Sequence, residues 1–151
     1  MTRVVLAVAV TLALFAVAAP AAAEAREYRS DRVVATELTT LERAGTALLD
    51  REDPTPDPAT GARRFVTLRV PGESWTTARV DWVALGGRPG SATPDPHLVA
   101  YAVTGGEPRT IELPFPLRTG GEGPLVLEGG GHHELRLSLA PNGVRVQRTG
   151  V

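Results

Sequence analysis

The chain has 151 residues, which is enough for one small domain and an extension. Its formal net charge is -1, so the composition indicates neither a nucleic-acid-binding surface nor a polybasic membrane patch. It contains no cysteine, which excludes disulfides, cysteine nucleophiles and cysteine-ligated metal sites. The domain must therefore be stabilised by its hydrophobic core, and nucleic acid is not expected as a partner.

The N-terminal segment over residues 1–23 is strongly apolar. After Arg3, residues 4–23 carry no charge and contain one proline, Pro20. A helix of about twenty residues spans about 30 Å, the thickness of a bilayer core. The small residues before Glu24 also resemble a signal-peptidase site. Two interpretations stay open: a retained membrane anchor, or a signal segment that is cleaved near Ala23.

Residues 24–51 predict an amphipathic helix. It begins with a charged collar over residues 24–30, placed where the chain would leave the membrane, and it contains no proline. Small or apolar residues then recur at the spacing of a helix packing face. These residues are Val34, Leu38, Leu41, Gly45 and Leu48. We expect this face to bind a protein partner through a helix of that partner, with Gly45 allowing close approach; the alternative is packing on the domain that follows.

If this face binds a partner, a charge at Leu41 should prevent that binding. Leu41→Arg is expected to abolish assembly with partners while the β-domain stays folded. The helix itself is predicted to end at a proline-rich linker over residues 52–62, because alternating prolines force an extended backbone.

Residues 63–151 predict an antiparallel β-domain. Alternating apolar and polar residues indicate six or seven strands, over residues 66–70, 78–85, 98–103, 110–115, 125–127, 135–139 and 144–147. Pro114 restricts its strand to a sheet edge or ends it, and Asn142-Gly143 predicts a tight hairpin. In strand 78–85, alternation places Val80, Trp82 and Ala84 on the core side. The fold class is therefore α+β: a long N-terminal apolar and amphipathic helix followed by a small antiparallel β-sandwich or β-sheet domain.

No combination of residues indicates catalysis. His132 and His133 are adjacent, so on a strand they point to opposite faces and do not form a metal site together. The serines lack a nucleophile-elbow context, so we predict that the protein is not an enzyme and uses no cofactor or metal. Trp75 follows a Pro-Gly turn, and Trp75 and His132 are the candidate surface contacts.

The order of segments resembles the plan of type IV pilins and pseudopilins. The resemblance rests on VVLAVAVTLALFAVAAP, RVVATELTTLERAGTALLDRE and the β-domain after them, with Pro20 about where pilins carry a helix-kinking proline. The sequence is also similar to a small uncharacterised family of halophilic archaea, whose members tend to be encoded near ATPases of type IV pilus-like systems. In pilins the apolar helix anchors the subunit and packs in a filament core, and the β-domain is displayed outside.

The sequence departs from the pilin pattern at the processing site. Arg3 runs directly into Val4, and no glutamate occurs before Glu24. A static anchor or accessory subunit therefore fits better than a processed pilin. We expect a non-enzymatic, single-pass membrane protein with an extracytoplasmic β-domain, acting in a type IV pilus-like or secretion apparatus. The alternative is a secreted, soluble β-sandwich binding module released near Ala23.

Overall fold

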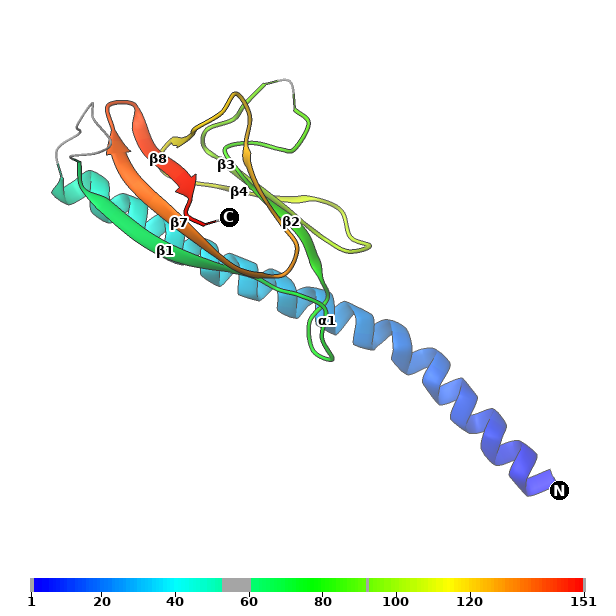
Figure 1. The fold of residues 1–151 in the computed structure, drawn as a ribbon. Helices are drawn as coiled ribbons and strands as arrows, with labels where there is room; N and C mark the ends of the chain where they lie inside the picture. Colours follow the sequence, from blue (N-terminus) through cyan, green and yellow to red (C-terminus); the bar gives the residue numbers. More distant parts are fainter. Residues whose placement is uncertain (1, 53–60, 92, 151) are drawn as a thin grey trace.

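The computed structural model describes residues 2–52, 61–91 and 93–150, and it confirms the α+β class. A single helix, α1 (Thr2–Arg51), protrudes from a β-domain, and its N-terminal end lies far from that domain (Figure 1). The described strands are β1 (Arg63–Val70), β2 (Val80–Leu85), β3 (Leu98–Val103), β4 (Arg109–Glu112), β5 (Leu117–Thr119), β6 (Leu125–Glu128), β7 (Gly131–Ala140) and β8 (Gly143–Arg148).

Helix α1 is continuous over 50 residues and contains Pro20 in its interior. At 1.5 Å per residue its length is about 75 Å, more than twice the thickness of a bilayer core. The residues on either side of Pro20 are mainly alanine, which has the highest helix propensity and limits the effect of the proline on the helix. The predicted linker begins where α1 ends, but residues 53–60 lie outside the described part of the chain.

The strands form two four-stranded sheets, with the orders β1-β7-β8-β5 and β4-β3-β2-β6. The pairings are antiparallel, as the sequence predicts, with one exception: β5 pairs with β8 in parallel. After β4 the chain crosses to the first sheet through Pro114 and Pro116 and enters beside β8 in the same direction. Val144 N–H donates to the carbonyl oxygen of Pro116 at 2.9 Å, which fixes this crossing.

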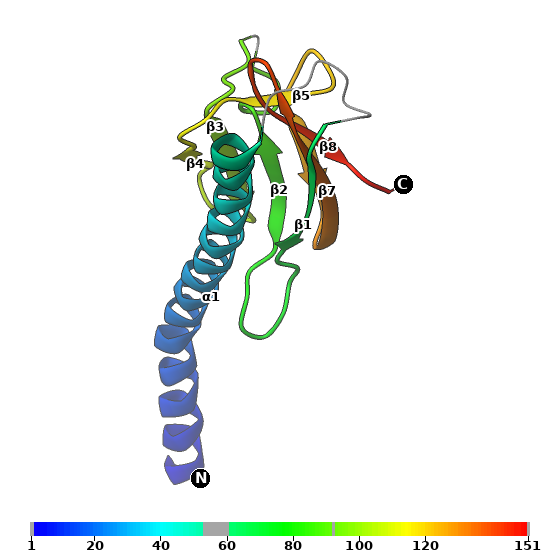
Figure 2. The same cartoon turned by 90° about the vertical axis from the view of Figure 1, so that its left-hand side faces the viewer.

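The core lies between the sheets and against the second half of α1. Figure 2 shows that half of the helix running alongside the domain, while the first half extends beyond it. The apolar side chains of the first sheet alternate inward as predicted, and the hairpin between β7 and β8 closes with Ala140 paired to Gly143. Gly143 has a φ of 130°, a conformation that glycine adopts at no steric cost.

Strand β2 departs from simple alternation. Its register against β3 shifts between Val80 and Trp82, which is the signature of a β-bulge. Because the bulge changes which side chains face inward, Val83 and Leu85 follow Val80 into the core cluster, and Trp82 is only half-buried. The predicted core position of Trp82 is thereby corrected. Strand β4 lies at a sheet edge and ends before Pro114, as predicted from that proline.

Candidate functional site

The first half of α1 presents a continuous apolar surface. Its large apolar side chains are each at least 51% exposed, and they are Val4, Val5, Leu6, Val8, Val10, Leu12, Leu14, Phe15 and Val17. Within the described part of the chain, α1 is the one helix that is long and apolar enough to cross a bilayer. Signal sequences also meet these requirements of length and apolar composition. So large an uncovered apolar surface is unfavourable in water, and it fits a membrane span or a signal anchor.

The predicted packing face on the second half of α1 is buried in the chain's own core. Its apolar side chains Val34, Leu38, Leu41 and Leu48 are no more than 2% exposed. Gly45 lies against the ring of Phe115, from the segment after β4. This face packs against the β-domain of the same chain, so the partner helix that the spacing suggests has no free surface there. That part of the sequence interpretation is corrected.

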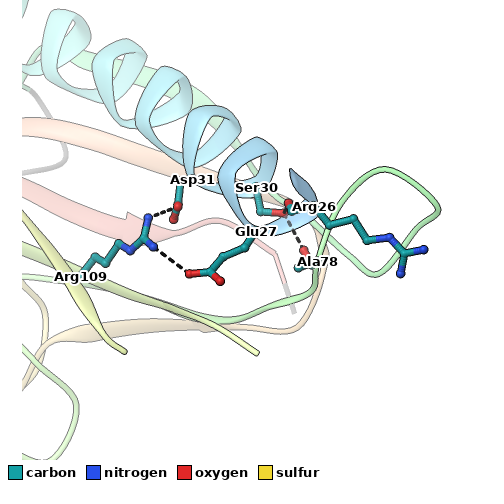
Figure 3. A network of polar contacts seen from close by, with 6 residues as sticks. All are labelled: Arg26, Glu27, Ser30, Asp31, Ala78 and Arg109. Atoms are coloured by element: carbon teal, nitrogen blue, oxygen red, sulfur yellow. Dashed lines mark hydrogen bonds and ion pairs between the residues drawn. The ribbon is translucent and has the colours of Figure 1, made fainter. Parts of the chain in front are cut away.

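A group of polar side chains lies where α1 enters the β-domain, and we call it the collar (Figure 3). Arg109 of β4 donates from Nη1 to the Asp31 carboxylate and from Nη2 to Glu27 Oε1, the latter at 2.7 Å. The Asp31 side chain is only 11% exposed, and its Oδ1 has no hydrogen-bond partner among the described residues. Arg109 therefore supplies the compensating charge for an almost buried carboxylate.

The collar also fixes the segment between β1 and β2, residues 71–79, which we call the Trp75 loop. The hydroxyl of Ser30 donates to the carbonyl oxygen of Ala78 at 2.8 Å, and Ala78 N–H donates to the carbonyl oxygen of Arg26. The Nε of Arg26 donates to the carbonyl oxygen of Trp75 at 3.0 Å. Four residues of the helix and loop are thus joined by hydrogen bonds over one helical turn, and Figure 3 shows the helix side of this contact.

Hydrogen bonds within the Trp75 loop define its shape. The Ser74 hydroxyl accepts from the backbone N–H of Thr76 and of Thr77, at 3.2 and 3.0 Å. The Thr77 hydroxyl donates to the carbonyl oxygen of Gly72 at 3.0 Å. At the tip, Trp75 is 91% exposed. The loop is the part of the β-domain that reaches furthest toward the N-terminal half of α1 (Figure 2).

An open cleft of about 600 Å³ lies between the Trp75 loop and α1. Two side chains contact the Asp81 carboxylate in this cleft: the Thr104 hydroxyl donates to it at 2.6 Å, and Arg79 Nε lies 3.8 Å from it. Glu27, which also lines the cleft, accepts from Arg109. Two of the carboxylates that line the cleft, Asp81 and Glu27, thus already have partners.

The two candidate contact residues lie at the same end of the first sheet. His132 is exposed on β7 and pairs in register with Arg69, just before the Trp75 loop begins. His133 points the other way and is buried, and neither of its ring nitrogens has a hydrogen-bond partner among the described residues. Within those residues there is no group of three or more histidine, aspartate or glutamate side chains that could hold a metal ion.

The collar contains Arg26, Glu27 and Ser30 from the charged segment predicted over residues 24–30, but the sequence does not indicate their contacts. Arg109 is 78 residues from Asp31 in the chain, so no local pattern relates them. The available signal was the i, i+4 repeat of polar residues at positions 26, 27, 30 and 31, which marks one polar stripe on the helix.

Comparison with known proteins gives one match. A family model described as a domain of unknown function, DUF7311, matches residues 1–149, which include both halves of α1 and all the described strands. Neither a curated protein nor a solved structure matches the chain. On the extent of the family match, the chain belongs to the DUF7311 family.

Proposed function

We propose that the protein is a membrane-anchored, non-enzymatic, pilin-like or accessory subunit of a type IV pilus-like or secretion apparatus. One observation carries the proposal: a single helix is apolar and exposed over its first half and is packed into the β-domain over its second half. This is the arrangement that the resemblance to pilins implies, with an anchoring helix and a displayed domain. The first half crosses the membrane, and the β-domain faces the outside.

The continuity of the helix through the junction supports a role in assembly. Helix α1 continues without interruption from the apolar half into the packed half, and the collar joins it to both β4 and the Trp75 loop. The direction of the anchor is therefore fixed relative to the β-domain. A subunit held at a fixed angle can present its domain in a defined orientation when its helix packs beside other helices, which a flexible tether would not allow.

The surface for a protein partner is the exposed half of α1. The face on residues 34–48 is already covered by the β-domain, whereas the apolar side chains between Val4 and Val17 are uncovered. In a bilayer these side chains contact lipid, and in an assembly they contact other helices. This relocates the expected partner contact from the second half of the helix to the first.

The absence of an enzymatic role is also part of the proposal. The cleft beside the Trp75 loop pairs Asp81 with Thr104 and Glu27 with Arg109. None of the contacts described for this cleft joins a nucleophile to a general base. The first pair links β2 to the residue that follows the neighbouring strand β3, and the second links α1 to β4.

One observation favours a secreted binding module as the second candidate. Among the described residues, the hydrogen bonds between α1 and the β-domain begin at Arg26, and the buried apolar face begins at Val34. Cleavage after Ala23 would therefore leave the collar and the core intact. The two candidates differ in whether residues 1–23 are retained.

Photo-crosslinking in the native membrane tests the proposal. A benzophenone amino acid replaces Phe15 in the apolar half; the matched control replaces Phe65 on the outer face of β1, since the two side chains are 69% and 67% exposed. We expect crosslinks from position 15, but not from position 65, to the membrane helix of a second copy or of another pilus-like subunit. Adducts with lipid alone would contradict assembly, and a soluble species that begins at Glu24 would support the secreted module. Protease added to intact cells should degrade the β-domain.

A further inference from the structure

The exposure of Trp75 requires an explanation. A tryptophan side chain gains more from leaving water than almost any other residue, yet Trp75 is 91% exposed. The other tryptophan, Trp82, is half-buried in β2. The loop around Trp75 is held by its own hydrogen bonds and by Arg26, so the exposed ring is presented from a defined position.

The position of the Trp75 loop along α1 points to its contact. When residues 4–23 fill the bilayer core, Ala23 lies at the core boundary. Arg26 is three residues further along the helix, or about 4.5 Å. The headgroup layer on each side of the core is about 5–7 Å thick. Since Arg26 Nε donates to the carbonyl oxygen of Trp75, that residue lies at the level of the headgroups.

We propose that the Trp75 loop is a second membrane contact, in which the indole ring of Trp75 lies in the lipid headgroup layer beside α1. Tryptophan is enriched at this depth because its apolar ring and its N–H group suit the boundary between hydrocarbon and water. This inference rests on the membrane anchor of the proposed function. It adds that the domain meets the membrane at two points, which fixes its tilt and its rotation about the helix axis.

The charges around the loop specify the kind of lipid surface. A second cleft, of about 340 Å³, also lies beside the loop. The side chains that line this cleft and the cleft of about 600 Å³ include four arginines and four carboxylates: Arg26, Arg29, Arg69, Arg79, Glu24, Glu27, Glu73 and Asp81. These charges balance, in contrast to the polybasic clusters that require anionic lipid. The contact therefore does not depend on anionic lipids, and a membrane of zwitterionic lipid is sufficient for it.

The depth of Trp75 can be measured by fluorescence quenching in the full chain. The chain contains two tryptophans, so Trp82→Phe leaves Trp75 as the single fluorophore, and Trp75→Phe leaves Trp82 as the matched control. Each variant is reconstituted into phosphatidylcholine vesicles that carry bromine either near the headgroup or deep in the acyl chain. Flotation first establishes that the protein is held by the vesicles.

We expect Trp75 to lose most of its emission with the shallow bromine, less with the deep bromine, and to be shielded from acrylamide in the aqueous phase. Trp82 should keep its emission with both lipids. The quenching of Trp75 can also be obtained with Trp82 unchanged, from the difference in emission between the unmodified chain and Trp75→Phe. Protein that floats but shows Trp75 quenched by acrylamide and by neither lipid would overturn the interfacial contact and leave the anchor standing. Protein that does not float would overturn the anchor itself.

Discussion

Gly45 of α1 lies directly against the aromatic ring of Phe115, and the Cβ of any other residue at position 45 would overlap that ring. Phe115 is buried in the core, in the segment where the chain crosses from the second sheet to the first. Glycine inside a helix costs about 1 kcal/mol relative to alanine. The close approach of α1 to Phe115 explains why a glycine occupies position 45 despite this cost.

Gly45→Ala should therefore destabilise the protein although it improves helix propensity. Overpacking of a filled site costs about 1–3 kcal/mol, which exceeds the gain in propensity. The free energy of unfolding in detergent, followed by denaturant titration, measures the difference. Adding Phe115→Leu should recover part of the loss, because the smaller side chain makes room for the methyl group. A more stable Gly45→Ala protein would show that α1 does not approach Phe115 this closely.

Leu41 and Leu49 provide a matched pair on the same helix. Leu41 is completely buried, whereas Leu49 is 40% exposed. Leu41→Ala should lower the free energy of unfolding by about 2–5 kcal/mol, because it removes buried apolar contacts and leaves a cavity. Leu49→Ala should change it by about 0.5 kcal/mol or less.

A charge at position 41 should have a larger effect than the cavity. Leu41→Arg would place an unpaired cation in the core, so we now expect α1 to separate from the β-domain. This outcome differs from the one expected from the sequence alone, in which the β-domain stays folded, because Leu41 packs in the core of the same chain. Limited proteolysis of α1 between residues 34 and 48 would detect the separation, and an undigested helix would contradict it.

Arg109→Ala should cost more than removal of an exposed arginine. It leaves the nearly buried Asp31 carboxylate without its cation, and the expected loss is about 2–3 kcal/mol, below that of a fully buried pair because the Arg109 side chain is 46% exposed. Arg79→Ala breaks a longer, exposed pair with Asp81 and should cost less than about 1 kcal/mol. Combining Arg109→Ala with Asp31→Asn should restore part of the stability. Equal losses for the two arginine variants would mean that Asp31 is well solvated.

Tyr101 should make the protein sensitive to alkaline pH. Burial raises the pKa of the Tyr101 phenol above its usual value of 10.0. The unfolded chain therefore loses this proton at lower pH than the folded protein does, so the stability from the neutral phenol is complete below about pH 10 and declines as the pH rises above it.

Denaturant titrations below and above that pH test the effect. Tyr101→Phe should remove the decline, and Tyr28→Phe is the control because Tyr28 is exposed. The sequence contains no lysine, so few other side chains titrate in this range. A decline of the same size in Tyr101→Phe would contradict the assignment.

Local patterns predicted the elements whose signals lie within a few residues. Strand β3 occupies the predicted residues 98–103, Pro114 ends its strand at a sheet edge, and Asn142-Gly143 forms the turn of the last hairpin. In each case the backbone chemistry of the segment itself decides the outcome. The sequence does not predict β5, because Leu117 is the one apolar residue among its three and no alternation is visible.

Local patterns in the sequence do not predict contacts between residues that are far apart in the chain. The spacing predicts that Leu38 and Leu41 lie on one packing face of the helix, but periodicity does not say which surface covers that face. The bulge between Val80 and Trp82 depends on the register against β3. The contact of Arg26 with Trp75 depends on a loop that folds back along the helix, so the exposed tryptophan was identified from its turn while its place beside α1 was not.

The most direct test of the account is the intact mass of the native protein in separated membrane and soluble fractions. We expect a species that retains residues 4–23 in the membrane fraction, because these residues remain as the anchor. A soluble species that begins at Glu24 would contradict the anchor and identify the protein as an exported β-domain.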